Sequence, residues 1–433
     1  MVDSKLDVVE VRGGLPLEAS EGATYSIDKD HAPRVTHNLY KYPTKYVSEI
    51  PRWAIEKYAE PGARVLDPFC GSGTTNLEAS LAGLDSVGLD VNPFSTLLAK
   101  VKTTPLSPTQ LERLLDLRHR ALEEALPGPG GPPLAGELPP LPNLYHWFPR
   151  ENALKLAALG AFARRVSDPD LRDFLLVVLA RILKRCSYAD DQSPKPYVSS
   201  KHPKVPKDPV EEFKTAFDAC FSAVEELSRW SPLGTARFVT ADSTSSALQG
   251  AVGGEGFSLV VTSPPYVNAF DLGRTFKFEL YWLGFVRSPA QMARFKERVL
   301  GTEKIPAQVR ATPPPPLGVK EVDDAARLVW ERDELRGHVV AKFFADAGQH
   351  FDAVAQLLPP GGRYVLVIGD STIRGVRVPS AAWLAKVAEA RGFERETSFS
   401  YVIRDRYLRI PRSNRGGKVE TDRVVVLSRR QDF

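Results

Sequence analysis

Two stretches of the chain, Asp67-Pro-Phe-Cys-Gly-Ser-Gly-Thr74 and Thr262-Ser-Pro-Pro-Tyr266, decide the fold. Each follows an apolar run that predicts a buried strand, at residues 64–66 before the first and 257–261 before the second. Residues 76–90, after the glycine-rich turn, predict a helix followed by a second strand. This succession of strand, turn, helix and strand predicts the beginning of a doubly wound, mainly parallel α/β sheet of the Rossmann-like kind.

The sheet pattern is interrupted between residues 105 and 230. A run rich in proline and glycine at 127–142 is unable to form a helix or a central strand. Three helical patterns follow, near residues 150–166, 169–185 and 208–229. We therefore expect a mainly helical insertion between residues 1–104, the first part of the sheet domain, and residues 231–433, its second part.

The second part returns to the sheet pattern at 236–240. A basic, helix-prone insertion is expected at about 286–320, and one long helix at 322–358. Strand patterns at 397–403 and 423–428 predict a C-terminal antiparallel hairpin that closes the sheet.

Composition narrows the class of protein. The chain has 433 residues, and 43% of them are hydrophobic, which allows a large core. Its net charge of +4 is compatible with a nucleic-acid partner. Cys70, Cys186 and Cys220 lie far apart with no metal-ligand spacing, which argues against a disulfide framework or a zinc site. The chain shows neither a signal-peptide pattern nor a membrane-spanning segment. We expect a cytoplasmic protein that has no metal site and does not associate with a membrane.

The glycine-rich turn has the features of a nucleoside-binding site. Glycines at 71 and 73 permit left-handed backbone and close approach to a ligand. Asp90, at the end of the next strand and followed by Val91 and Asn92, is placed to accept hydrogen bonds from ribose hydroxyls. The spacing GSG, rather than GxGxxG, favours a mononucleoside over a dinucleotide. A plain strand-to-helix turn in another α/β enzyme is the alternative interpretation.

The second motif offers a hydroxyl, a proline carbonyl and an aromatic ring side by side. Hydrogens of an exocyclic amine would bond to the Ser263 hydroxyl and the Pro264 carbonyl, while Tyr266 would stack on the base. Pro264 and Pro265 fix the backbone that presents this carbonyl. With the glycine turn, this suggests methyl transfer from S-adenosylmethionine to a nucleobase amine. A proline-rich turn without a catalytic role is the alternative.

The two motifs together resemble a known family. DPFCGSGTT followed by GLDVNP is similar to the cofactor half of the amino-methyltransferases that modify exocyclic amines of DNA bases, and TSPPY resembles the catalytic motif of their cytosine-N4 branch. The resemblance covers roughly residues 37–104 and 236–430. It implies S-adenosyl-L-methionine as the cofactor and double-stranded DNA as the partner, with the enzyme acting alone or beside a restriction endonuclease specific for the same site.

The resemblance also assigns residues. The segment from His37 to Lys45 resembles the part of the family that encloses the methionine moiety, and Asp242 matches the acidic position that contacts the adenine amine. The implied cofactor-binding set is Tyr42, Thr44, Asp67, Pro68, Phe69, Cys70, Gly71, Ser72, Gly73, Thr74, Asp90, Val91, Asn92, Asp242 and Ser243.

Other substrates stay open at this stage. Serine at position 263 favours cytosine N4 over adenine N6, because the adenine enzymes mostly carry an acidic residue there. An adenine-N6 DNA methyltransferase, an RNA amino-methyltransferase and a non-catalytic nucleic-acid-binding protein of the same fold are the alternatives. The catalytic motif follows the cofactor motif, the reverse of the largest group with such glycine motifs, so target-recognition segments do not transfer.

Basic residues in two loops are candidates for DNA contact, with a solvated surface as the alternative. The helical insertion is a further candidate for target recognition. The candidate residues in the two loops are Lys195, Lys201 and Lys204, then Arg404, Arg406, Arg409, Arg412 and Arg415.

Overall fold

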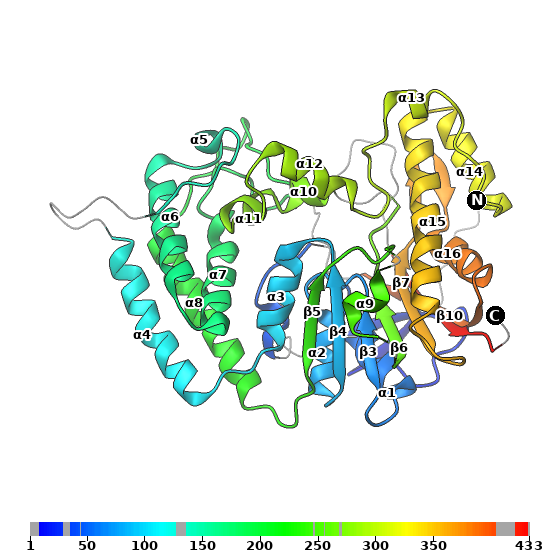
Figure 1. Ribbon diagram of the computed structural model, residues 1–433, viewed down its shortest axis with the longest axis horizontal. Helices are drawn as coiled ribbons and strands as arrows, with labels where there is room; N and C mark the ends of the chain where they lie inside the picture. The colour runs from blue at the N-terminus through cyan, green and yellow to red at the C-terminus, as the bar shows by residue number, and fades with distance from the viewer. Residues whose placement is uncertain are drawn as a thin grey trace.

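The computed structural model describes residues 8–28, 35–43, 45–126, 136–245, 247–254, 256–267, 271–403 and 421–431. Its centre is a nine-stranded sheet (Figure 1). In sheet order the strands are β1 (Val8–Arg12), β2 (Thr24–Asp28), β10 (Phe393–Val402), β11 (Thr421–Arg429), β7 (Arg363–Gly369), β6 (Phe257–Thr262), β3 (Arg64–Asp67), β4 (Asp85–Asp90) and β5 (Ala236–Thr240).

The strand order confirms the predicted fold class. From β3 the chain proceeds to β4 and β5 on one side, then returns to β6 on the other side of β3 and continues to β7. All neighbouring pairs in this part are parallel, and β11 runs antiparallel to both β7 and β10. The reversal between β3 and β6 forms a switch point, where ligands bind in open α/β sheets. Both sequence motifs follow these two strands.

Alternation along the strands explains why helices cover both faces of the sheet. On β7, Tyr364 and Leu366 belong to one core and Val365 and Val367 to the opposite one. The helices of the first core are α9 (Leu248–Val252), α14 (Lys320–Trp330), α15 (Glu334–Ala355) and α16 (Ser380–Glu389). Those of the second are α1 (Glu49–Tyr58) and α2 (Thr74–Leu81).

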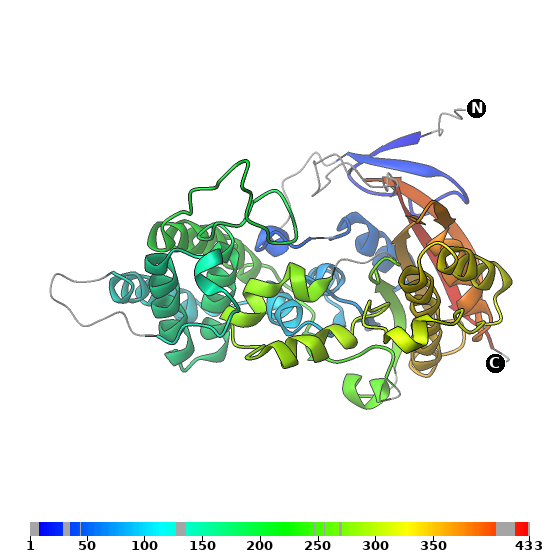
Figure 2. The same ribbon diagram turned by 90° about the horizontal axis from the view of Figure 1, so that it is seen from above.

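The predicted helical insertion lies beside α3 (Pro93–Thr103), beyond the β5 edge of the sheet (Figures 1 and 2). Its helices are α4 (Pro108–Glu124), α5 (Leu144–Trp147), α6 (Arg150–Arg165), α7 (Pro169–Leu183) and α8 (Pro209–Ser228). Their core also contains Phe94 of α3 and Trp282 of α11 (Lys277–Trp282). The insertion therefore shares its core with segments from both parts of the sheet domain. The neighbouring elements after β6 are α10 (Leu272–Thr275), α11 (Lys277–Trp282), α12 (Pro289–Glu297) and α13 (Ala307–Arg310).

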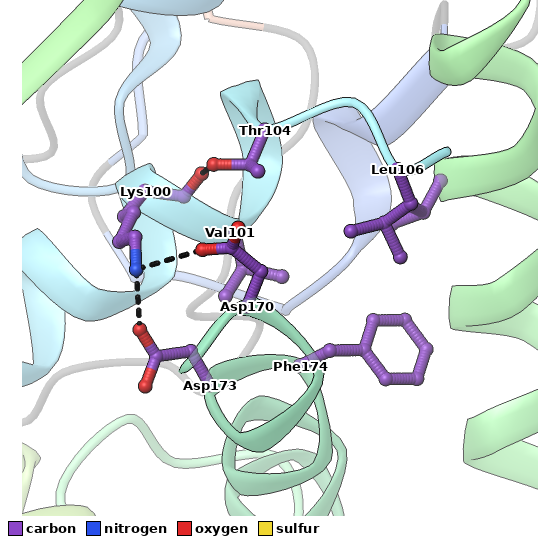
Figure 3. Close-up of a pocket in the computed structure, with 8 residues that line it drawn as sticks. Lys100, Val101, Thr104, Leu106, Asp170, Asp173 and Phe174 are labelled. Carbon is purple, nitrogen blue, oxygen red and sulfur yellow. Dashed lines mark hydrogen bonds and ion pairs between the residues drawn. The ribbon is translucent and has the colours of Figure 1, made fainter. Parts of the chain in front are cut away.

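Ion pairs also fasten the insertion to the sheet domain. The Lys100 ammonium of α3 lies 3.0 Å from Asp170 and 2.8 Å from Asp173, both on α7 (Figure 3). These residues and Phe174 line a small pocket at the junction of the two parts. The pocket lies along α3 and α7, so it is distinct from the strand ends that carry the motifs.

Two expectations need correction. The C-terminal hairpin exists, but it does not close the sheet, because β2 pairs in parallel with β10 and β1 pairs with β2. The helix expected at 322–358 is two helices, and the Asp333 side chain caps the second by accepting from the Arg336 amide at 3.0 Å. The stretch at 286–320, expected to be helix-prone, contains the two short helices α12 and α13.

Candidate active site

A direct hydrogen bond joins the two motifs at the carboxyl ends of β3 and β6. The Thr262 hydroxyl donates to Asp67 Oδ1 at 2.6 Å, and the Phe69 amide donates to the same oxygen at 3.1 Å. Leu66 pairs with Val260 in the parallel ladder, which brings the two strand ends level. The glycine turn and the Ser-Pro-Pro-Tyr segment therefore begin side by side at the carboxyl ends of these two neighbouring strands.

The Asp67 carboxyl group is fully buried. Burial raises its pKa to about 6, although hydrogen bonds from Thr262, Thr75 and the Phe69 amide act in the opposite direction. Through Oδ1 alone Asp67 joins the two motifs, while its buried Oδ2 has no hydrogen-bond partner among the described residues.

The buried Asp67 predicts a specific dependence of stability on pH. Its pKa is raised in the folded protein, so folding binds protons here and this carboxyl destabilises the protein as pH rises towards and through 6. Asp67→Asn removes this pH-dependent contribution to stability, because the amide does not titrate, and it retains an acceptor oxygen. Between pH 5 and pH 8 the wild type should lose about 1–2 kcal/mol relative to the variant. Thermal melting at both pH values tests this, and a constant difference in Tm would contradict it.

The glycine turn uses left-handed backbone at two positions, Gly71 with φ 49° and Gly73 with φ 73°. Gly73 caps the N-terminus of α2, and a Cβ placed on it would lie 2.6 Å from Ala99 Cβ of α3. A Cβ on Gly71 would lie 3.4 Å from the ring of Tyr42. The turn therefore needs glycine at position 73 for close helix packing, and at position 71 for the left-handed backbone, since a Cβ there would make only an ordinary contact with Tyr42.

Asp90 organises the same turn from the end of β4. Its carboxylate accepts from the Gly71 amide at 3.0 Å and from the Asn92 amide at 2.8 Å, one bond on each oxygen. Burial, with a smaller contribution from the negative charge of Asp67, raises its pKa to about 7. Each oxygen has a further lone pair, so Asp90 is able to accept from two adjacent hydroxyl groups.

Tyr42 closes one side of this turn. Its hydroxyl bonds to Ser95 Oγ at 2.8 Å, and its ring packs against Phe276 with the centroids 5.0 Å apart. Thr44, the other residue predicted in this segment, lies outside the described residues.

The loop after β5 brings Asp242 to the same end of the sheet. Asp242 Oδ1 accepts from the amide of Thr244 at 2.9 Å and from its hydroxyl at 2.7 Å. His350 of α15 bonds to the Ser243 carbonyl at 3.2 Å and packs its ring 4.8 Å from that of Phe69. Burial lowers the His350 pKa to about 4, so its neutral ring ties this loop to the glycine turn.

In the catalytic motif, Ser263 is half-buried, and its side chain forms no hydrogen bond with another described residue. Tyr266 differs, because its hydroxyl donates to Asp422 Oδ1 of β11 at 2.5 Å. Asp422 carried no signal in the sequence beyond a polar residue at the start of a strand.

Burial divides the predicted site residues into two groups. The buried group forms the frame of the site: Asp67, Pro68, Cys70, Ser72, Gly73, Thr74, Asn92, Ser243 and Pro264. The half-buried group is accessible to a ligand: Tyr42, Phe69, Gly71, Asp90, Val91, Asp242, Ser263, Pro265 and Tyr266. The second group supplies the carboxylates, the free hydroxyl and the aromatic rings that the predicted chemistry requires.

The predicted DNA contacts fare unequally. The Lys204 ammonium already has partners within the protein, because it donates to the carbonyls of Lys184 and Ala189 and to Asp191 Oδ1, at 2.7, 3.1 and 2.8 Å. Lys195 is half-buried and Lys201 is exposed. The basic residues predicted between positions 404 and 415 lie outside the described residues: Arg404, Arg406, Arg409, Arg412 and Arg415.

Two absences hold for the described part of the chain. It contains no cluster of three or more histidine, cysteine or acidic residues that could hold a metal ion. None of its helices combines the length and the apolar character needed to span a membrane.

Comparison with known proteins shows what this chain is similar to. Residues 21–100 match the model of the DNA methylase family N6_N4_Mtase. The chain is 23% identical over 363 residues to the type II methyltransferase M.MvaI of Kocuria varians, covering 80% of this chain and 79% of the relative. It is also 23% identical over 406 residues to the type II methyltransferase M.BsoBI of Geobacillus stearothermophilus, covering 83% and 78%.

Among solved structures, the rRNA methyltransferase aviRa of Streptomyces viridochromogenes is similar at 13% identity with a TM-score of 0.33, covering 90% of this chain and 87% of that one. From its strand order and its matches, this chain has a Rossmann-like α/β methyltransferase fold and resembles the DNA amino-methyltransferases. The match to N6_N4_Mtase includes the glycine turn and Asp90, while both type II relatives align with most of the chain.

Proposed function

We propose that this chain is an S-adenosylmethionine-dependent DNA methyltransferase that modifies the N4 amine of cytosine in a specific sequence. The observation that carries the proposal is the hydrogen bond between Thr262 and Asp67, 2.6 Å long. It sets a nucleoside-type glycine turn beside a Ser-Pro-Pro-Tyr segment at the switch point of the sheet. The methyl donor and the target base would therefore be held at the carboxyl ends of β3 and β6.

The accessible residues fit the cofactor. The Asp90 carboxylate has free lone pairs for the two ribose hydroxyls, and Gly71 leaves room beside the Tyr42 ring. Asp242 accepts from Thr244 with one carboxylate oxygen, and its other oxygen is available for the amine of the cofactor's adenine. When bound, S-adenosylmethionine supplies an electrophilic methyl group on a sulfonium centre. Tyr42, Asp90 and Asp242 would hold it.

Ser263 and Pro264 would act on the target amine. The amine lone pair is conjugated with the base, so it is a weak nucleophile. Hydrogen bonds from the amine to the Ser263 hydroxyl and the Pro264 carbonyl would favour a pyramidal nitrogen with its lone pair free to attack. Tyr266 would stack on the extracted base, an interaction worth about 1–3 kcal/mol that offsets part of the cost of base flipping.

DNA would lie across the strand ends and the helical insertion. The insertion shares one core with α3 and α11, so it holds a fixed position next to the site. Lys195, Lys201 and the arginines from Arg404 to Arg415 are the proposed phosphate contacts. Lys204 is left out because its ammonium is used within the loop.

The identity of the modified base tests the proposal. The chain is expressed in a bacterial host that lacks DNA methyltransferases, and the purified DNA and RNA are digested to nucleosides for mass spectrometry. We expect N4-methylcytosine in DNA and in no other fraction, with DNA from the empty-vector host as control. N6-methyladenine in DNA, or a methylated base only in RNA, would show that the assigned target is wrong.

A further inference from the structure

A carboxylate from a strand distant in the sequence holds the Tyr266 hydroxyl. The hydroxyl donates to Asp422 Oδ1 of β11 at 2.5 Å. Asp422 and Gly369 face each other in the antiparallel ladder of β7 and β11. The carboxylate that holds the hydroxyl therefore belongs to the sheet, and its position is fixed by the core.

Asp422 is itself held on its other oxygen. The Tyr401 hydroxyl of β10 donates to Asp422 Oδ2 at 2.9 Å. Tyr401 is 1% exposed and Asp422 is 6% exposed, so water does not compete for these bonds. The carboxylate accepts one tyrosine on each oxygen, and Tyr266 is the partly accessible member of this group.

We propose that Asp422 is a positioning residue for the methyl transfer: through the Tyr266 hydroxyl it sets the plane of the ring on which the target base stacks. This inference rests on the proposed function. A tyrosine has two free torsions in its side chain. The hydroxyl anchor fixes the first, which sets the ring axis, and because a phenol O–H bond prefers the ring plane, the direction of its hydrogen bond favours one ring orientation about the second. The base is then held at a fixed distance from Ser263.

A purely structural role for Asp422 predicts something different. In that case its loss would loosen the sheet near β11 and lower activity by an amount unrelated to Tyr266. If Asp422 acts through the Tyr266 hydroxyl, removing that hydroxyl should already cause the loss, and removing Asp422 afterwards should add little. A double-mutant cycle separates the two cases.

The cycle compares Tyr266→Phe, Asp422→Ala and the double variant. Transfer of tritiated methyl groups from S-adenosylmethionine to genomic DNA of a methylation-deficient bacterium gives kcat and the KM for DNA. Each single variant should lower kcat about 10- to 100-fold, since small displacements of a reacting group have effects of this size. The kcat of the double variant should be within about threefold of the kcat of the less active single variant.

Two matched variants control for folding. Asp422→Asn has the same shape and keeps an acceptor oxygen, so its loss of kcat should be smaller than that of Asp422→Ala. Tyr401→Phe removes the other donor to the same carboxylate and leaves the Tyr266 bond in place, so it should stay within about threefold of the wild type. Affinity for S-adenosylmethionine, measured by calorimetry, should be retained by every variant that folds.

The outcomes are distinct. If the losses multiply in the double variant, or if Tyr401→Phe lowers kcat as much as Tyr266→Phe, Asp422 has no specific action through Tyr266 and the inference is wrong. If Asp422→Ala does not fold, the cycle is run with Asp422→Asn, whose smaller loss must still vanish in the Tyr266→Phe background. If the wild type transfers no methyl group to DNA, the proposed function itself fails, and this inference falls with it.

Discussion

Ser263→Ala is expected to lower kcat for methyl transfer about 100- to 1,000-fold, the loss typical for removing one hydrogen-bonding group at a reacting centre. Ser263 is half-buried, and its hydroxyl has no hydrogen-bond partner among the described residues, so the substitution breaks no internal contact there. The loss should appear in kcat while the affinity for S-adenosylmethionine stays within about twofold, because this hydroxyl acts on the amine of the base.

Ser263→Asp provides the matched control. A carboxylate is a stronger acceptor than a hydroxyl, and its negative charge would stabilise the positive charge that develops on the amine. We therefore expect this variant to retain more activity than Ser263→Ala. Rates are measured with saturating DNA and labelled cofactor, and melting curves establish that each variant is folded. Equal rates for Ser263→Ala and the wild type would remove serine from the mechanism.

Local signals made most of the fold predictable. The helices α4, α7 and α8 of the insertion begin where a cap residue precedes a proline. At Asp168-Pro169 and Asp208-Pro209 the carboxylate accepts hydrogen bonds from the amides of the first turn. The central strands are short β-branched runs followed by turn residues, and both faces of these strands are buried. Such signals lie within a few residues of one another, so the sequence pattern contains them.

Non-local contacts explain what the sequence did not reveal. The strand β2 has a partner in β10 from the opposite end of the chain, and the pairing involves only two residue pairs. Asp422 acquires its role by the insertion of β11 between β7 and β10. Lys204 looks like any surface lysine in sequence, yet its ammonium is enclosed by two carbonyls and a carboxylate. In each case the decisive partner is set by the sheet or by the loop conformation.

Gly73→Ala should destabilise the protein far more than Gly62→Ala, although both residues have a left-handed backbone, with φ 73° and 79°. At Gly62 a Cβ meets nothing within 4 Å, so alanine there costs only the backbone strain of about 1–2 kcal/mol. At Gly73 the Cβ would lie 2.6 Å from Ala99 Cβ and 3.0 Å from Ala99 Cα. Overpacking of this kind lowers the free energy of unfolding by about a further 1–3 kcal/mol, in addition to the backbone strain.

The collision at Gly73 lies between the glycine turn and α3, so its effect should extend to the cofactor. We expect Gly73→Ala to lower Tm by several degrees more than Gly62→Ala and to weaken S-adenosylmethionine binding at least about tenfold, since the turn must move away from α3. Adding Ala99→Gly removes the nearer of the two colliding atoms and should recover part of both losses. If the two glycine variants melt alike, or if Ala99→Gly recovers nothing, the close packing of the turn against α3 is not what requires glycine at position 73.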